Sequence, residues 1–299
     1  MPTPIVISAS RRTDIPAFYM DWFMRGIETG YFRVKNPFNQ AVSIVPAAPD
    51  AVHTIVFISK NYGRFIEGNY GERLAEMGYH LFFNFTLNSE AKLLEPNLPP
   101  LMERIEQARE LARLFGPETV QWRFDPICFY RDGNGRTGNN LGDFMNIAEK
   151  LAGFGIRRCI TSFADIYAKV KTRTAKMDDF EFIDPPMATK VRVVEKMAAR
   201  LKNLGISLYT CCEKDLIDAL PESTTVRPSA CIPNRYLVEL FGGALSYRKD
   251  SGQRGAKGCG CNASRDIGDY DAHPCFHNCL YCYANPAEIK RIQCPTNLK

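Results

Sequence analysis

Short apolar runs rich in β-branched and aromatic residues alternate with helical stretches along most of the chain. The predicted strands are residues 5–8, 53–58, 80–87, 120–124, 159–162 and 206–210. The predicted helices are residues 16–28, 64–77, 100–114, 141–152 and 187–204. Segments 32–34 and 42–45 predict a hairpin or an inserted pair of strands. Such alternation is typical of a parallel sheet with helices outside it.

We therefore predict an α/β fold that is a full or partial TIM-like (β/α) barrel. The alternative is an open, doubly wound sheet. After about Leu220 the pattern changes, and residues 248–255 are polar and glycine-rich, which predicts a long loop. We predict a barrel over residues 1–220, and over residues 221–299 an irregular, cysteine-rich, cluster-binding tail that packs on the barrel.

Composition excludes several classes of protein. Hydrophobic residues make up 45% of the chain and charged residues 24%, which is typical of a globular protein. The net charge of +5 permits an anionic substrate but does not indicate a nucleic acid partner. Arg11 and Arg12 follow the first apolar run, whereas a signal peptide carries its charges before it. No apolar run is long enough to span a bilayer, so we expect a cytoplasmic protein with no membrane partner.

The clustering of cysteines is the strongest functional signal. The chain has 11 cysteines, and six of them lie between Cys231 and Cys282. In a reducing compartment, clustered cysteines bind metal more often than they form disulfides. Cys275, Cys279 and Cys282 have the spacing C-x3-C-x2-C. Because a [4Fe-4S] cluster usually has four cysteine ligands, a loop with three leaves one iron open for another ligand.

Residues 275–284 resemble the signature of the radical S-adenosylmethionine (radical SAM) superfamily, C-x3-C-x-aromatic-C, and its spore photoproduct lyase-like members. Tyr281 occupies the aromatic position. The resemblance implies that S-adenosylmethionine binds the open iron through its amino and carboxylate groups, with Tyr281 beside the adenine. It also implies reductive cleavage to a deoxyadenosyl radical and an electron donor such as flavodoxin or ferredoxin.

The position of the motif departs from that superfamily, because most members carry it after the first barrel strand. As a whole, the chain resembles a bacterial family, domain-of-unknown-function family 1848. A permuted radical SAM barrel reconciles the position, since the first and last strands of a barrel are neighbours. Residues 261–264 are the predicted last strand, and the similarity of residues 9–15 to residues 263–267 also suggests that the two ends lie close together.

A second metal site is predicted from the remaining cysteines. Four thiolates complete a closed iron–sulfur cluster or a zinc site. The predicted ligands are Cys212, Cys231, Cys259 and Cys261. The alternative is that Cys211 and Cys212 are small, buried apolar residues. Cys128 and Cys159 are predicted to be core residues.

Polar residues follow several predicted strands at their carboxyl ends, where the sites of barrel enzymes lie. Arginines there suit carboxylate or phosphate groups, although Arg123 and Asp125 have the alternative of simply pairing. Asp14 is predicted to be a helix N-cap. The candidate catalytic residues are Arg11, Arg123 and Asp125, and the candidate cofactor-binding residues are Tyr281, Asn84, Ser10 and Arg12.

Three functions are consistent with these patterns. The first is an iron–sulfur enzyme of radical SAM type that acts on a small-molecule or unknown substrate. The second is a non-enzymatic protein whose iron–sulfur cluster or zinc is structural or redox-active, with His277 or His273 as a further zinc ligand. The third, nucleic acid repair, rests only on the likeness to the photoproduct lyase.

Overall fold

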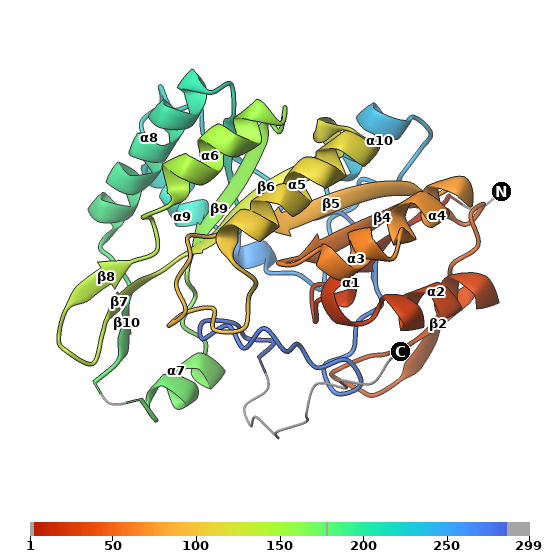
Figure 1. Ribbon diagram of the computed structural model, residues 1–299, viewed down its shortest axis with the longest axis horizontal. Coiled ribbons are helices and arrows are strands. Elements are labelled where there is room, and N and C mark those ends of the chain that lie inside the picture. Colours follow the sequence, from red (N-terminus) through yellow and green to blue (C-terminus); the bar gives the residue numbers. More distant parts are fainter. Residues whose placement is uncertain (1–2, 178, 286–299) are drawn as a thin grey trace.

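A single parallel sheet organises the chain (Figure 1). The computed structural model describes residues 3–177 and 179–285. The sheet has eight strands in the order β12-β11-β9-β6-β5-β4-β1-β13, and all neighbouring strands are parallel. These strands are β1 (Ile5–Ala9), β4 (Val52–Ser59), β5 (His80–Thr86), β6 (Val120–Ile127), β9 (Arg158–Phe163), β11 (Ser207–Thr210), β12 (Arg227–Pro228) and β13 (Arg265–Asp266).

Helices that connect the strands pack on one face of the sheet. Alternate strand residues such as Phe57, Phe83 and Trp122 share a core with them, because successive side chains on a strand point to opposite faces. These helices are α1 (Ile15–Phe18), α2 (Met20–Thr29), α3 (Gly63–Glu67), α4 (Tyr70–Glu76), α5 (Leu101–Phe115), α6 (Phe144–Gly153), α8 (Met187–Asn203) and α9 (Lys214–Ala219). A short 3-10 turn, Pro117–Thr119, follows α5.

The other face of the sheet is covered by the C-terminal third of the chain. Val56 and Phe82 point to this face and pack against Ile232 and against Leu237 of α10 (Asn234–Phe241). A closed barrel is not shown, because β12 and β13 form the two edges of the sheet and are not paired among the described residues. An open parallel sheet with both faces covered is compatible with the doubly wound alternative, although the strands from β1 to β12 follow one another in sequence order.

Most predicted elements are confirmed, with shifted boundaries. The predicted helix at 16–28 is split at Tyr19, and the one at 64–77 is split by Asn69, whose φ of 50° is left-handed. The predicted hairpin is β2 (Tyr31–Lys35) with β3 (Val42–Pro46). Several elements were not predicted. Three of them form a small antiparallel sheet: β7 (Phe129–Arg131), β8 (Thr137–Asn139) and β10 (Glu181–Ile183). The others include α7 (Ala168–Thr174), α9, α10 and β12.

The two ends of the described chain meet in the sheet. Ile7 and Ser8 of β1 pair with Arg265 and Asp266 of β13, so the predicted proximity of the ends is confirmed. The predicted last strand at residues 261–264 is wrong, since the pairing begins only at Arg265. The segment before it runs antiparallel past Lys249 through a single bridge. Among the described residues, no helix is both long and apolar enough to cross a membrane.

Asp266 holds the end of β1 in place. Its carboxylate accepts hydrogen bonds from the hydroxyl groups of Ser8 (3.1 Å) and Ser10 (2.7 Å) and from the backbone N–H of Arg11 (2.7 Å). It also pairs with the guanidinium of Arg11 at 3.4 Å and that of Arg12 at 4.0 Å. This buried carboxylate therefore joins the first strand of the chain to the last.

We predict that Asp266→Asn lowers the free energy of unfolding by about 3 kcal/mol, because it removes the charge that partners two largely buried arginines. Urea denaturation followed by circular dichroism measures the change. The control is Asp271→Asn, which alters an exposed carboxylate in the following segment. An unfolding midpoint equal to that of the control contradicts the role given to Asp266.

Candidate functional site

Cys275, Cys279 and Cys282, which we call the loop thiols, lie on a tight loop that crosses the carboxyl ends of the strands. The N–H of Cys282 donates to the carbonyl of Cys279 (3.1 Å), and the N–H of Leu280 donates to the carbonyl of Leu94 (2.8 Å). Asn278 has a φ of 55°, a left-handed conformation that Asn tolerates better than most residues. The backbone therefore bends sharply between the first two thiols.

A guanidinium group from α7 fastens this loop. Nη1 of Arg173 donates to the carbonyl of Leu280 (2.6 Å), and its Nη2 donates to the carbonyls of Cys282 (3.2 Å) and Asn285 (3.0 Å). The side-chain amide of Asn285 donates in turn to the carbonyl of Cys279 (3.0 Å). Hydrogen bonds to a charged donor are the stronger ones, so Arg173 holds the loop in one conformation.

The loop thiols lie close enough to one another to share an electrostatic environment. Burial raises the pKa of all three, and Cys275 and Cys282 contribute further to the raised pKa of Cys279. The ammonium group of Lys60 acts in the opposite direction on each of them. Since the thiolate is the metal-binding form of cysteine, Lys60 favours the state that a metal requires.

Lys60 belongs to a buried polar network that also contains Tyr281. Its Nζ donates to Glu95 at 2.7 Å and to the hydroxyl of Tyr281 at 2.9 Å. The amide of Asn88 donates to the same hydroxyl (3.1 Å), and the hydroxyl donates to Glu95. Burial alone lowers the pKa of Lys60, but Glu95 and Cys279 outweigh it, so the pKa is raised. The predicted contact between Tyr281 and an adenine stays a prediction.

Asp14 connects the cysteine loop to the segments that follow β1 and β4. It caps α1 by accepting from the N–H of Ala17 (3.0 Å), which confirms the predicted N-cap. Its carboxylate also accepts from Nε2 of His277 (2.8 Å) and from the N–H of Lys60 (2.8 Å). The side chain thus tethers β1, β4 and the cysteine loop at one point.

The surroundings of His277 and His273 test whether either could be a further ligand of zinc. Nε2 of His277 is taken by Asp14, and its Nδ1 is buried with no hydrogen-bond partner among the described residues. His273 packs against Trp22 with ring centroids 4.1 Å apart. Within residues 3–177 and 179–285, no three His, Cys, Asp or Glu side chains are arranged to hold one metal ion. The structure therefore offers no preformed site for a single zinc.

A second set of thiols, which we call the five-thiol group, consists of Cys211, Cys212, Cys231, Cys259 and Cys261. They lie on the face of the sheet that the C-terminal third of the chain covers, which we call the inner face. All five thiols belong to one packed cluster, in which the Sγ atoms of Cys211 and Cys212 lie 3.8 Å apart. Cys231, Cys259 and Cys261 lie close enough to that pair and to one another to affect its pKa values and their own. The predicted second ligand set thus comes together, and Cys211, which that prediction left out, joins it.

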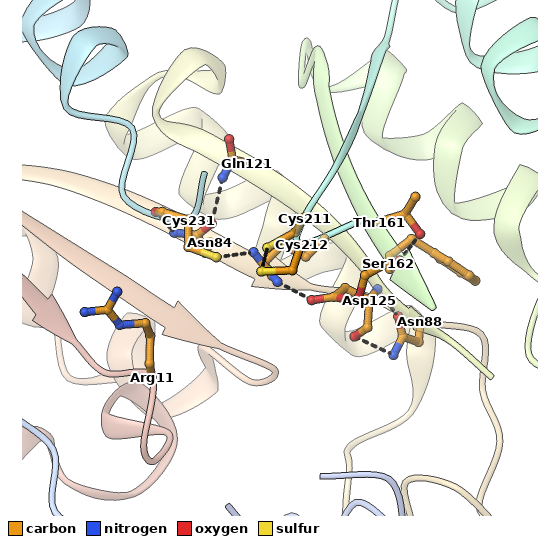
Figure 2. A network of polar contacts seen from close by, with 12 residues as sticks. Arg11, Asn84, Asn88, Gln121, Asp125, Thr161, Ser162, Cys211, Cys212 and Cys231 are labelled. Carbon is orange, nitrogen blue, oxygen red and sulfur yellow. Dashed lines mark hydrogen bonds and ion pairs between the residues drawn. The ribbon is translucent and has the colours of Figure 1, made fainter. Parts of the chain in front are cut away.

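The chain leaves strand geometry at Cys212. The N–H of Cys211 continues the ladder by donating to the carbonyl of Thr161 (2.9 Å), whereas Cys212 has a left-handed φ of 59°. Consecutive residues of a strand would point to opposite faces. Here the Sγ atoms of Cys211 and Cys212 lie 3.8 Å apart on the same side (Figure 2).

Positive charge surrounds the five-thiol group. Nη1 of Arg123 donates to the Sγ of Cys231 at 2.7 Å. Hydrogen bonds from Cys211 and Cys261, followed by the charge of Arg123, lower the pKa of Cys231 well below its usual range. Hydrogen bonds from Cys212 and Cys261 lower the pKa of Cys259 to about 3. The group therefore favours thiolates at two of its members.

The predicted polar residues at the strand ends fall into two places. Arg123 pairs with Asp125, as the simpler alternative held, and the hydroxyl of Ser162 also donates to Asp125. The amide of Asn84 donates to the carbonyl of Cys231 (3.0 Å) and accepts from Gln121 (2.7 Å), as Figure 2 shows. Asn84, Arg123 and Asp125 thus lie at the five-thiol group rather than at the loop thiols.

Arg11 lies between the two cysteine groups. Its carbonyl accepts from the hydroxyl of Tyr283 (2.7 Å), which neighbours Cys282. Its guanidinium donates to Asp250 (3.1 Å) and is close enough to Cys261 and Cys231 for their charges to raise its pKa. Burial acts in the opposite direction and is the largest single influence on that pKa.

Both Ser10 and Arg12 hold the junction between β1 and β13, so their contacts are structural. Ser10 binds Asp266, and Arg12 donates to the carbonyl of Gly268 (2.9 Å). Cys128 and Cys159 are buried core residues, as predicted. Cys294 and the end of the predicted tail, residues 286–299, lie outside the described residues.

Reasoning from sequence missed Lys60, Glu95 and Arg173. Lys60 directly follows β4. Polar residues at the same position after other strands were chosen as candidates, so Lys60 could have been predicted in the same way. Glu95 lies in an irregular loop and Arg173 in a short helix within a charged segment. Neither position carries a pattern that distinguishes it from a solvated surface charge.

We predict that Arg173→Ala speeds alkylation of Cys279 and Cys282 in metal-free protein on the order of tenfold, because the loop loses several charge-assisted hydrogen bonds. Iodoacetamide labelling read by peptide mass spectrometry measures the rate. Lys171→Ala, an exposed change on the same helix, is the matched control. Equal labelling rates in the two variants would show that Arg173 does not hold the loop.

Comparison with known proteins places the chain in a family. No curated protein matches it. The model of the family described as "Domain of unknown function (DUF1848)" matches residues 6–284, a span that contains both cysteine groups. The whole-chain resemblance seen in the sequence is therefore confirmed, and the chain belongs to the DUF1848 family.

Proposed function

We propose that the protein is an iron–sulfur enzyme of radical SAM type, in which the loop thiols hold a [4Fe-4S] cluster. The observation that carries the proposal is the presentation of three thiols, one buried and two partly buried, on one short, fastened loop. Three thiolates leave one iron of such a cluster without a cysteine. This is the coordination that binding of S-adenosylmethionine requires.

The residues around the loop fit an anionic cluster. Three thiolates with their cluster bring net negative charge into a buried place, which is unfavourable unless cations lie nearby. Lys60 and Arg173 supply two such cations, and the side chain of Lys60 is only 16% exposed. The donor set is also the soft thiolate chemistry that iron–sulfur clusters need.

S-adenosylmethionine bound with such a cluster would supply a deoxyadenosyl radical for hydrogen abstraction from a substrate. The chain itself binds and orients the groups around that chemistry. Lys60 and Asp14 fix the loop from the side of β4 through Tyr281 and His277. Tyr281 is the proposed neighbour of the adenine. An external donor such as flavodoxin or ferredoxin delivers the electron to reduce the cluster.

The second candidate is a non-enzymatic protein in which a metal centre only holds the loop against the sheet. The dense fastening of the loop by Arg173 and Asp14 favours this reading, because a structural site also benefits from a fixed loop. The absence of a preformed single-ion site among the described residues speaks against zinc in this role. The two candidates differ in whether S-adenosylmethionine is cleaved.

We predict that anaerobically reconstituted protein forms 5′-deoxyadenosine from S-adenosylmethionine when dithionite is supplied. The Cys279→Ala variant should form it only at the background rate, because a cluster ligand is lost. Liquid chromatography with mass spectrometry quantifies the product. If protein loaded with iron and sulfide yields no deoxyadenosine, the enzymatic proposal fails and the structural candidate remains.

Cys128→Ala is the matched control for that experiment. Cys128 packs in the same apolar cluster as Cys279 and Tyr281, but its thiol contacts the carbonyl of Pro126 at 3.9 Å. We expect this variant to retain cluster and activity. Loss of both would identify Cys128 as a fourth ligand and remove the open iron on which the proposal depends.

A further inference from the structure

The five-thiol group has no part in the proposed function, yet the fold assembles it from three separate segments. Cys211 and Cys212 follow β11, Cys231 precedes α10, and Cys259 and Cys261 precede β13. All five are free thiols that gather in one cluster, where the Sγ atoms of Cys211 and Cys212 lie 3.8 Å apart. Apolar packing alone gives no reason for five cysteines from three segments to gather at one place.

The approach of two of these segments requires a glycine. A Cβ built on Gly260, which separates Cys259 from Cys261, would lie 2.6 Å from the carbonyl oxygen of Ser229. Any other residue would push the backbone of this segment away from Cys231. The short sequence Cys259-Gly260-Cys261 is therefore shaped to bring two thiols against a third.

Buried polar side chains hold the other segment against the sheet. The amide of Gln121 donates to the carbonyl of Ala230 at 3.4 Å, and that of Asn84 donates to the carbonyl of Cys231 at 3.0 Å. Both amides are fully buried on the inner face of the sheet. Placing two amides in a core is unfavourable unless their hydrogen bonds are satisfied, and here they fix the position of Cys231.

Guanidinium groups face the sulfurs. The side chain of Arg123 is 9% exposed and shares its N–H groups between Asp125 and the sulfur of Cys231. Nη1 of Arg11 is buried without a hydrogen-bond partner among the described residues, in a side chain that interacts with Cys231 and Cys261. Cations directed at sulfur are expected where the thiols are ionised.

From these observations we infer that the five-thiol group binds a second, fully ligated [4Fe-4S] cluster, distinct from the one proposed for the loop thiols. Its ligands are Cys231, Cys259, Cys261 and one thiol of the Cys211–Cys212 pair. The inference stands independently of the proposed function, because none of these residues belongs to the loop.

The ligand set is the one that an iron–sulfur cluster takes. Four cysteine thiolates are the usual complement of a [4Fe-4S] cubane, one at each iron. A zinc ion takes four thiolates as well, so the iron and sulfide content of the protein separates the two.

The test uses the full chain purified without oxygen. Removing the loop cluster by Cys275→Ala, Cys279→Ala and Cys282→Ala together should leave about four irons and about four sulfides per chain, the content of one cubane. Adding Cys259→Ala and Cys261→Ala should remove them. In the loop-depleted background, Cys159→Ala is the matched control, because that thiol is buried on the helical face of the sheet.

Wild-type protein gives a second measurement that does not depend on how the variants fold. Two clusters predict about eight irons per chain, and one cluster predicts about four. Loop-depleted protein that holds no iron, or holds zinc in place of iron and sulfide, overturns the inference. If instead the loop-depleted protein keeps all the iron of the wild type, the cluster proposed for the loop fails while this one stands.

Arg123 gives an independent readout of where the second cluster lies. Hydrogen bonds to cluster sulfurs help set the reduction potential, so Arg123→Gln in loop-depleted protein should make that potential more negative. A redox titration monitored by electron paramagnetic resonance measures it. Arg173→Gln, whose guanidinium contacts only the loop, should leave it unchanged. An unaltered potential in the Arg123 variant would place the iron elsewhere.

Discussion

The parallel pairing of β1 with β13 is the contact on which the arrangement of both cysteine groups depends. It brings Asp266 of the C-terminal segment to the carboxyl end of the first strand, where it binds Ser10 and Arg11. The cysteine loop follows β13 directly, so it emerges at the edge of the sheet where the other strands end. The pairing sets the position of the loop relative to Lys60 and Asp14 together with the hydrogen bonds from Arg173 and His277.

Charge balance explains how so many thiols are tolerated in buried places. Ionised sulfur is stabilised there only by nearby cations or hydrogen-bond donors. Lys60 serves the loop thiols and Arg123 the five-thiol group, and each cation also has a carboxylate partner, Glu95 or Asp125. Arg11 reaches both groups, through its carbonyl at one and its guanidinium at the other. The two sites are therefore neighbours that share one wall, the segment after β1.

Patterns that depend on nearby residues predicted the structure well. The alternation of strands and helices follows from local hydrophobic periodicity. The predicted bounds of the six longer sheet strands lie within a few residues of the observed ones. Closure of the sheet was not predictable in this way, because it depends on whether β12 meets β13, and the C-terminal segment instead packs on the inner face. The spacing of the loop cysteines likewise identified them, since all three lie on one short loop.

The sequence by itself determined the positions of β1, β4, β5, β6, β9 and β11, which cysteines form the loop and that Asp14 caps a helix, because each of these follows from contacts between neighbours in the chain. Only the tertiary structure decided that Cys211 joins Cys231 and that Lys60 and Arg173 serve the loop. Those contacts join residues far apart in sequence, and their partners are chosen by how the sheet and its covering segments pack. No local pattern encodes that choice.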